Sequence, residues 1–344
     1  MRIVEISFLC TFLIMLFLFS SSNAQINWNI YTEGGYFNSV NGNSSQPNDL
    51  LLRLDGNLNY SYSKDNVLAA VKLKVRPEVY GSDNNFRSLK LRASGNYSQA
   101  NESLNWGVDL AGQRNFYQNK VSDFTYSIFL LTVNSDWHES KDYSVSTQVG
   151  FSYQTASENF EQNLDLLFLE AAILKSLFPN NTSGLGIYIE RFKIDNKYLS
   201  RLTNSASTNK GWRYGPQISF NYFEHGIISL EYRFLLHSSQ VTKHPSYEHW
   251  IRLVAGMIFS ESWSVFLLTD YYDRKFTLNK ENPAEEYLIY NPLDAENKVN
   301  IKLARELSEV IESYVKVGYF KERFFDSRFN FEGWNILFGI EVGY

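Results

Sequence analysis

The residues best suited to catalysis or metal binding gather in one short stretch of the chain. Three of the five histidines, His237, His244 and His249, fall there, and Ser238 directly follows the first of them. A nucleophilic serine needs a base and an orienting acid beside it, and zinc needs several nitrogen, sulfur or oxygen ligands. Carboxylates do not stand at ligand spacing here, and serine after histidine at a strand end is typical of turns. We therefore predict no enzyme, no metal site and no cofactor, although pairing of the flanking strands would bring His237 near His249.

A second group of charged residues follows a period of two instead of clustering. Lys72, Lys74 and Arg76 occupy every second position of one segment, and Lys90 and Arg92 do the same in a later one. Residues two apart share one face of a strand, so these five would form a basic stripe on adjacent strands. The stripe could bias nearby ions, or its cations could pair with carboxylates across the sheet, and the sequence leaves both alternatives open.

The same alternation runs through most of the chain and indicates long strands with one apolar face. In residues 50–62, Leu50, Leu52 and Leu54 alternate with Arg53 and Asp55, as a pleated strand demands and a helix would not allow. The pattern recurs in residues 67–78, 89–97, 104–113, 143–153, 212–222, 228–237 and 299–306, and more weakly near 26–34, 124–137, 162–177, 185–194, 247–259, 263–275 and 311–321. These segments reach the ~9 to 11 residues that a tilted strand needs to cross a bilayer.

Two of the weaker segments carry apolar residues at both odd and even positions. They run from Phe124 to Trp137 and from Leu164 to Ile173. A bulge would move side chains from one face to the other, and a locally apolar interior would also explain the pattern. Both segments are predicted as strands, and their register stays open.

The connections between the predicted strands alternate between short and long. The short ones are residues 64–66, 99–102, 139–142, 178–182, 224–226, 260–262 and 308–310, and the long ones are 38–49, 81–87, 117–123, 155–161, 195–211, 238–246, 276–297 and 322–332. Seven turns and eight loops predict about sixteen strands, within a range of 14–18. The acidic, proline-containing loop 276–297 would either fold inward toward the basic stripe or extend into solvent.

The N-terminal residues have the pattern of a secretory signal peptide. A basic Arg2, an apolar run from Ile6 to Phe19 and small residues at Ser22 and Ala24 meet its requirements. The apolar run is shorter than the ~20 residues of a spanning helix. We therefore predict a cleaved signal at residues 1–24 and a single domain at 25–344. The one cysteine, Cys10, lies in the signal, so disulfides and thiolate chemistry are excluded from the mature chain.

The C-terminal segment alternates as far as the last residue. Its apolar positions are Trp334, Ile336, Phe338, Ile340, Val342 and Tyr344. This resembles the C-terminal signature by which outer-membrane β-barrel proteins of Gram-negative bacteria are delivered to their assembly machinery, and the rest of the chain resembles the porin-like superfamily in pattern only. The resemblance implies an outer-membrane location, contact with outer-membrane lipid and recognition by that machinery. The last strand would close on the one near residues 26–30, leaving no unpaired edge in lipid.

The rival fold is a soluble all-β sandwich, which also alternates. Its strands are usually ~5 or 6 residues long, about half the length of those predicted here. Aromatic residues also cluster at strand ends, for example Tyr60 and Tyr62, and Phe116 and Tyr117, as in a membrane barrel. The net charge of -5 and mean hydropathy of -0.30, without a basic tract, exclude a nucleic-acid partner. We predict an all-β, antiparallel, up-and-down transmembrane β-barrel.

A polar interior and the absence of a predicted plug favour passive, porin-like diffusion of small solutes through this barrel. Twelve charged residues are expected to line the passage: Lys72, Lys74, Arg76, Lys90, Arg92, Arg213, Glu231, Arg233, Glu248, Arg252, Asp270 and Lys302. The alternative is an export, assembly or surface-apparatus barrel that works with periplasmic partners and conducts nothing alone. The third hypothesis is a barrel enzyme that uses His237-Ser238-Ser239. The chain could act as a homo-oligomer or with a periplasmic partner.

Overall fold

The computed structural model describes residues 24–39, 49–81, 86–119, 125–140, 142–156, 162–196, 208–242, 245–275, 298–322 and 331–343. Residues 1–23 of the predicted signal peptide, the acidic loop 276–297, His244 and the C-terminal Tyr344 lie outside this part of the chain. Ala24, predicted as the last residue of the signal, begins the first strand. In these ranges no helix is both long and apolar enough to cross a membrane.

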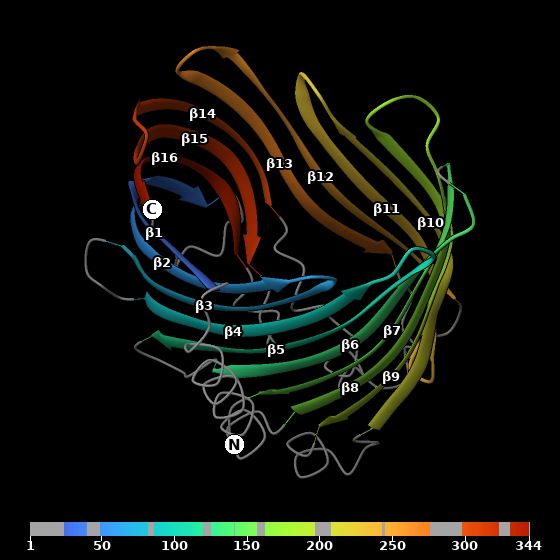
Figure 1. The fold of residues 1–344 in the computed structure, drawn as a ribbon. Coiled ribbons are helices and arrows are strands. Elements are labelled where there is room, and N and C mark those ends of the chain that lie inside the picture. The colour runs from blue at the N-terminus through green and yellow to red at the C-terminus, as the bar shows by residue number, and fades with distance from the viewer. Residues whose placement is uncertain are drawn as a thin grey trace.

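The described chain folds as one closed antiparallel barrel of sixteen strands (Figure 1), as the alternation predicted. The strands are β1 (Ala24–Ser39), β2 (Asp49–Lys64), β3 (Val67–Tyr80), β4 (Phe86–Ala100), β5 (Leu104–Asn119), β6 (Tyr126–His138), β7 (Tyr143–Ala156), β8 (Gln162–Lys175), β9 (Asn181–Asn196), β10 (Thr208–Phe223), β11 (Gly226–Ser239), β12 (Ser246–Ser260), β13 (Trp263–Lys275), β14 (Lys298–Ser308), β15 (Ile311–Glu322) and β16 (Phe331–Gly343). Each strand pairs with its neighbours in the chain, so the topology is up-and-down.

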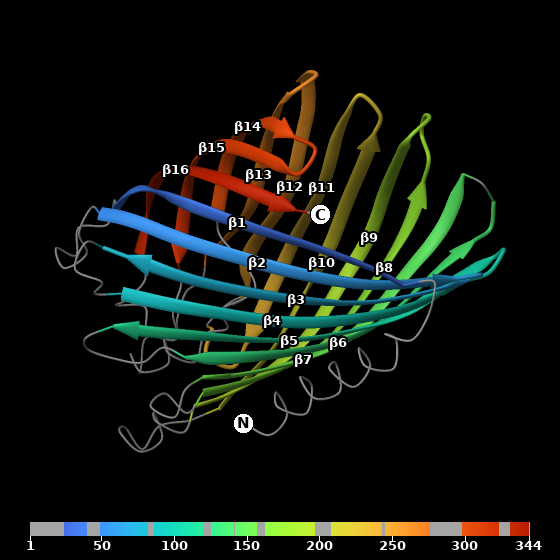
Figure 2. The same ribbon diagram turned by 60° about the vertical axis from the view of Figure 1, so that its left-hand side comes forward.

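Closure joins the first strand to the last. β1 pairs with β16 from Asn29 opposite Gly343 to Ser39 opposite Gly333, and the two lie side by side in both ribbon views (Figures 1 and 2). The pairing matches the prediction that the C-terminal strand closes on residues 26–30. It satisfies backbone donors and acceptors that would otherwise form an open edge.

One end of the barrel carries the seven short turns predicted from the sequence. The tightest are residues 65–66, 224–225, 261–262 and 309–310. At the first of them Asp65 has a φ of 50°, in the left-handed region that aspartate and asparagine tolerate in tight turns. We call this the turn end and the opposite one the loop end.

Alternation separates an apolar outer face from a polar inner face. On β2, Leu50 and Leu52 are 60% and 62% exposed on the outside, whereas the inward-facing Asp55 is 0% exposed. The outer face also carries aromatic residues near both ends of the strands. Those toward the turn end are Trp28, Tyr62, Tyr97, Trp106, Trp137, Tyr143 and Tyr222, and those toward the loop end are Tyr36, Phe116, Trp212, Tyr247, Tyr271, Tyr319 and Trp334.

The two strands with ambiguous alternation contain no bulge. β6 pairs with β5 and β7, and β8 with β7 and β9, without a register shift. Leu130 on β6 and Leu166 on β8 instead point inward and line an internal cavity. Of the two alternatives left open by the sequence, the locally apolar interior is the correct one. Register shifts occur beside turns, at Ile258/Ser260 and Glu306/Ser308.

Candidate functional site in the barrel interior

A cavity of about 710 Å³ lies against the inner wall, with residues from β2 to β9, β11 and β12 around it. Its lining residues are Asn59, Ala70, Lys72, Arg92, Ser94, Gly95, Asn96, Asp109, Leu110, Ala111, Ile128, Leu130, Thr132, Gln148, Ser152, Gln154, Leu166, Phe168, Glu170, Tyr188, Glu190, Arg233, Trp250 and Arg252. Because it spans so many strands, the cavity belongs to the lumen of the barrel and not to a crevice between neighbouring strands.

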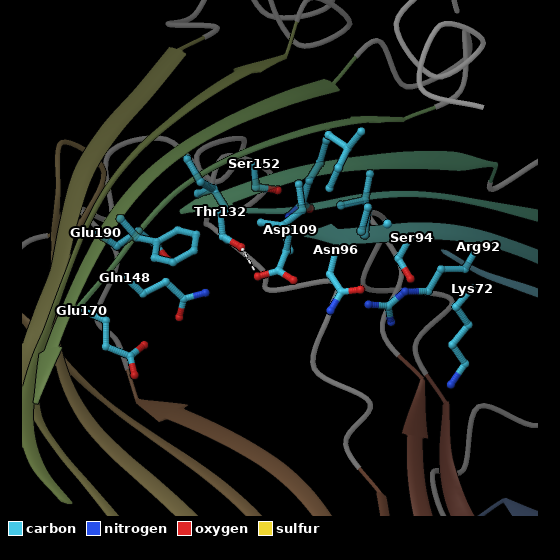
Figure 3. A pocket seen from close by; sticks show the side chains of 18 of the residues that line it. Lys72, Arg92, Ser94, Asn96, Asp109, Thr132, Gln148, Ser152, Glu170 and Glu190 are labelled. Carbon is cyan, nitrogen blue, oxygen red and sulfur yellow. Dashed lines mark hydrogen bonds between the residues drawn. The ribbon is translucent and has the colours of Figure 1, made fainter. Parts of the chain in front are cut away.

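Opposite charges occupy opposite sides of this cavity. Lys72 and Arg92, from β3 and β4, lie on one side, and Glu170 and Glu190, from β8 and β9, lie on the other (Figure 3). Between them Asp109 accepts hydrogen bonds from Asn134 (2.7 Å) and from Thr132 (3.3 Å). Glu170 and Glu190 are each paired with an arginine, Arg233 (2.8 Å) and Arg213 (3.0 Å), so the carboxylates on that side are neutralised locally.

The predicted basic stripe divides into paired and unpaired cations. Lys74 lies 3.2 Å from Asp55, Arg76 contacts the same carboxylate, and Lys90 lies 3.3 Å from Glu78. Lys72 and Arg92, in contrast, form no hydrogen bond or ion pair within the described residues. Pairing with carboxylates therefore holds for three of the five cations, and the other two, Lys72 and Arg92, face the cavity. That they bias nearby ions stays a prediction.

One paired cation, Lys90, shares Glu78 with an ion network that crosses the closure of the barrel. Arg53 bridges Glu33 (2.9 Å) and Glu78 (2.6 Å). Tyr314 on β15 donates to Glu33 (2.9 Å), and Lys316 contacts the same carboxylate. The network ties β15 to β1, β2 and β3 through side chains, in addition to the backbone pairing of these strands.

A second network is buried on the inner face of β9 to β12. Arg213, which is 0% exposed, bonds Glu190 (3.0 Å) and Glu248 (2.6 Å). His237 Nδ1 lies 2.7 Å from the second oxygen of Glu248, and Tyr188 donates to Glu190 (2.6 Å). Buried charges of this kind are tolerated because each has a partner of opposite sign or a hydrogen bond.

Arginines and aromatic rings connect this second network to the cavity. Arg233 lies over the ring of Tyr188 (4.3 Å) and bonds Glu170 (2.8 Å) and Glu231 (2.6 Å). Arg252 lies over the ring of Trp250 (4.2 Å). Stacking on rings holds these guanidinium groups in place, so their positive charge is fixed beside the cavity.

All twelve predicted lining residues face the interior, but only four of them contact the cavity: Lys72, Arg92, Arg233 and Arg252. Lys74, Arg76, Lys90, Arg213, Glu231 and Glu248 lie in the ion pairs described above. Asp270 accepts a hydrogen bond from Trp250 Nε1 (2.9 Å), and Lys302 pairs with Glu312 (2.5 Å). That the twelve line a conducting passage remains a prediction.

Several cavity residues were missed by the sequence reasoning. Glu190 stands beside Arg191, so neither face of β9 looks apolar at that point in the sequence. Asp109, Glu170 and Gln154 are single polar residues that alternation alone does not distinguish from any other inward position. The sequence signal that marked part of this wall as unusual was the presence of apolar residues at both odd and even positions of β6 and β8.

The histidine and serine candidates do not come together. His237 pairs with Ser246, and His249 pairs with Phe234, so the expected approach of His237 to His249 was wrong. His237 is buried inside, whereas His249 is exposed on the outer face beside Tyr232. Ser238 is exposed and points away from His237, because successive side chains alternate across a strand. The described residues contain no group of three or more histidines, cysteines or carboxylates able to hold a metal ion.

No model of a known protein family matches the chain, and no curated protein matches it in sequence. Solved structures with a similar arrangement include Pseudomonas putida OprB, at 11% identity over 94% of each chain and a TM-score of 0.47. Acinetobacter baumannii OccAB3 is 7% identical over 94% of this chain and all of that one, with a TM-score of 0.46. A bacterial polysaccharide outer membrane secretin is 7% identical over 94% and 100%, with a TM-score of 0.39. At these values the likenesses assign neither a family nor a function.

Proposed function

We propose that this protein is an outer-membrane channel through which small solutes diffuse passively. The closed sheet satisfies its own backbone hydrogen bonds, and an apolar outer face with aromatic residues toward both ends suits a lipid bilayer. In this arrangement the turn end faces the periplasm and the loop end faces outward, as in bacterial barrels generally. The proposed location follows from these surface properties.

The observation that carries the channel proposal is the cavity with unpaired charge. Lys72 and Arg92 project into about 710 Å³ of internal space without a carboxylate partner among the described residues. An ammonium or guanidinium group without a counter-charge requires water around it. This part of the interior is therefore expected to be wet, as a conducting lumen must be.

Conductance across a planar bilayer tests the proposal. The full chain, purified from membranes and confirmed as β-rich by circular dichroism, is expected to give steady single-channel currents. Replacing both free cations, Lys72→Gln with Arg92→Gln, should lower the permeability of chloride relative to potassium, because the local positive potential is removed. Lys64→Gln, at the exposed end of β2 beside a turn, removes one charge outside the lumen and should leave selectivity unchanged. A folded barrel that stays silent would contradict the channel proposal.

A second candidate is an export or assembly barrel that works with periplasmic partners. The buried networks favour it, since Arg213 and Glu248 have no exposed surface although they belong to the inner wall. If side chains largely fill the interior at the level of Arg213 and Glu248, they would restrict the passage of solutes. Co-purification of a periplasmic protein with a silent barrel would support this function, whereas isolation of a conducting monomer or homotrimer would count against it.

A further inference from the structure

The inner wall of β6 and β8 carries an apolar panel that a simple aqueous lumen does not require. Ile128 and Leu130 on β6, and Leu166 and Phe168 on β8, all line the cavity. Leu166 is only 6% exposed, and the other three are half-buried. Because lumen positions of wide barrels are usually polar, four apolar side chains together point to a surface that meets something other than water.

The two unpaired cations stand beside this panel in the strand register. Arg92 pairs with Gln113, which pairs with Ile128, so the first cation and the edge of the panel are two strands apart. At ~4.8 Å between neighbouring strands this separation is about 10 Å along the wall. In the adjacent row, Lys72 pairs with Ser94, Ser94 pairs with Ala111, and Ala111 pairs with Leu130. The small side chain of Ala111 leaves the path between cation and panel open.

A polar side chain without a partner lies within the panel. Gln154 on β7 pairs with Ile128 on one side and Leu164 on the other, and it lines the cavity. It is only 2% exposed, yet its Oε1 has no hydrogen-bond partner. Buried amide oxygens normally have one, so this atom is a polar exception within an otherwise apolar panel.

We propose that the cavity binds organic monocarboxylates with an aryl or alkyl body, the carboxylate at Arg92 and Lys72 and the body on the panel. The proposal rests on the channel function above, since the ligand reaches the cavity through the lumen. On the far side Glu170 is paired with Arg233 (2.8 Å) and Glu190 with Arg213 (3.0 Å), so Lys72 and Arg92 are the cavity cations that have no carboxylate partner among the described residues. An inorganic anion would leave the panel unused, and a neutral apolar solute would leave the cations unused.

Three probes distinguish the contribution of the ligand's charge to binding from that of its apolar body. The full chain in amphipol is titrated by calorimetry with 4-phenylbutyrate, with its neutral amide 4-phenylbutyramide, and with acetate. We expect 4-phenylbutyrate to bind about tenfold or more tightly than either of the others, because only it satisfies both halves of the site. Equal binding of all three probes, or no binding of 4-phenylbutyrate, would overturn the proposal.

Matched variants test the cationic half and the apolar half of the proposed site separately. Arg92→Gln with Lys72→Gln should abolish the preference for the acid over the amide, and Leu130→Asn should weaken both phenyl ligands about equally. The controls are Lys64→Gln, a cation outside the lumen, and Leu268→Asn, an inward position of β13 that does not line the cavity. Both controls should bind like the parent, and circular dichroism verifies folding of each variant. An unchanged preference in the double variant would contradict the assignment.

Conductance measured on the same samples distinguishes this inference from the channel proposal. A barrel that binds 4-phenylbutyrate but passes no current supports the ligand site and refutes the channel. A barrel that conducts without discriminating between the probes supports the channel and refutes the ligand site. Partial block of the current by 4-phenylbutyrate, relieved in the double variant, would support both.

Discussion

At the scale of single residues, Asp55 neutralises two cations of the basic stripe, Lys74 and Arg76. Its carboxylate is fully buried and contacts Lys74 (3.2 Å) and Arg76, and it accepts a hydrogen bond from Tyr31 (2.5 Å). Lys72 has the same chemistry as Lys74 but lies one row nearer the turn end, opposite Asn59. A lysine on the inner face of β3 is therefore paired with Asp55 at position 74 and, among the described residues, unpaired one inward-facing position away, at position 72.

Removing this carboxylate should destabilise the barrel. Asp55→Asn leaves two partly buried cations without their counter-charge, so we expect a loss of about 3 kcal/mol in the free energy of unfolding, at the low end for a broken buried pair. Urea unfolding in lipid vesicles, followed by tryptophan fluorescence, measures it. Asp109→Asn is the matched control, since Asp109 accepts hydrogen bonds but has no ion pair among the described residues, and it should lose only about 1 kcal/mol. Equal losses would show that the ion pairs contribute nothing.

At the scale of elements, the seam between β1 and β16 needs a residue without a side chain. Gly35 pairs with Leu337, and a Cβ at this position would lie 2.0 Å from the backbone oxygen of Ile336. Backbone atoms cannot move aside as a flexible side chain can, so the two strands would have to separate locally. Closure of the barrel thus depends on close backbone approach as well as on hydrogen bonding.

Gly35→Ala is expected to weaken the seam. The strain should cost about 1–3 kcal/mol, as for other overpacked positions, and should appear as a lower temperature at which the folded band disappears in unheated gel electrophoresis. Gly56→Ala on β2 is the control, because a Cβ there meets no atom within 4 Å. A seam variant as stable as this control would mean that β1 and β16 do not approach as closely as described.

Alternation identified the elements well because it is a local property. Leu50, Leu52 and Leu54 must share a face whatever the strand pairs with. Contacts between strands depend on register, which local patterns do not contain. His237 and His249 illustrate this, since a hairpin register that pairs His249 with Phe234 puts the two histidines on opposite sides of the wall.

At the scale of the whole molecule, the outer surface is a continuous apolar band. Val133 on β6 is 50% exposed near the middle of its strand, between Val108 and Val149 on the neighbouring strands. A surface of this kind is stable against hydrocarbon and unfavourable in water. The membrane location proposed for the barrel therefore makes a depth-dependent prediction about added charge.

Val133→Arg should destabilise the barrel in lipid vesicles by about 2–4 kcal/mol, the cost of arginine near the middle of a bilayer. Ser238→Arg is the control, because Ser238 is exposed on the same outer surface near the loop end of β11, and there the cost should be about 0–1 kcal/mol. Urea titration of vesicle-inserted protein measures both. Similar small costs at the two positions would place Val133 in water and refute the membrane location.

The sequence by itself determined the strands, their number, the turns and the closure by the last strand, because each follows from alternation along a continuous segment. Only the tertiary structure decided which charges are free. Lys72 and Arg92 face the cavity unpaired, whereas Arg213 and Glu248 are buried against each other. It also placed Ile128 and Leu166 together on the inner wall. The physical reason is that charge pairing and apolar clustering depend on distances between strands, which sequence periodicity does not encode.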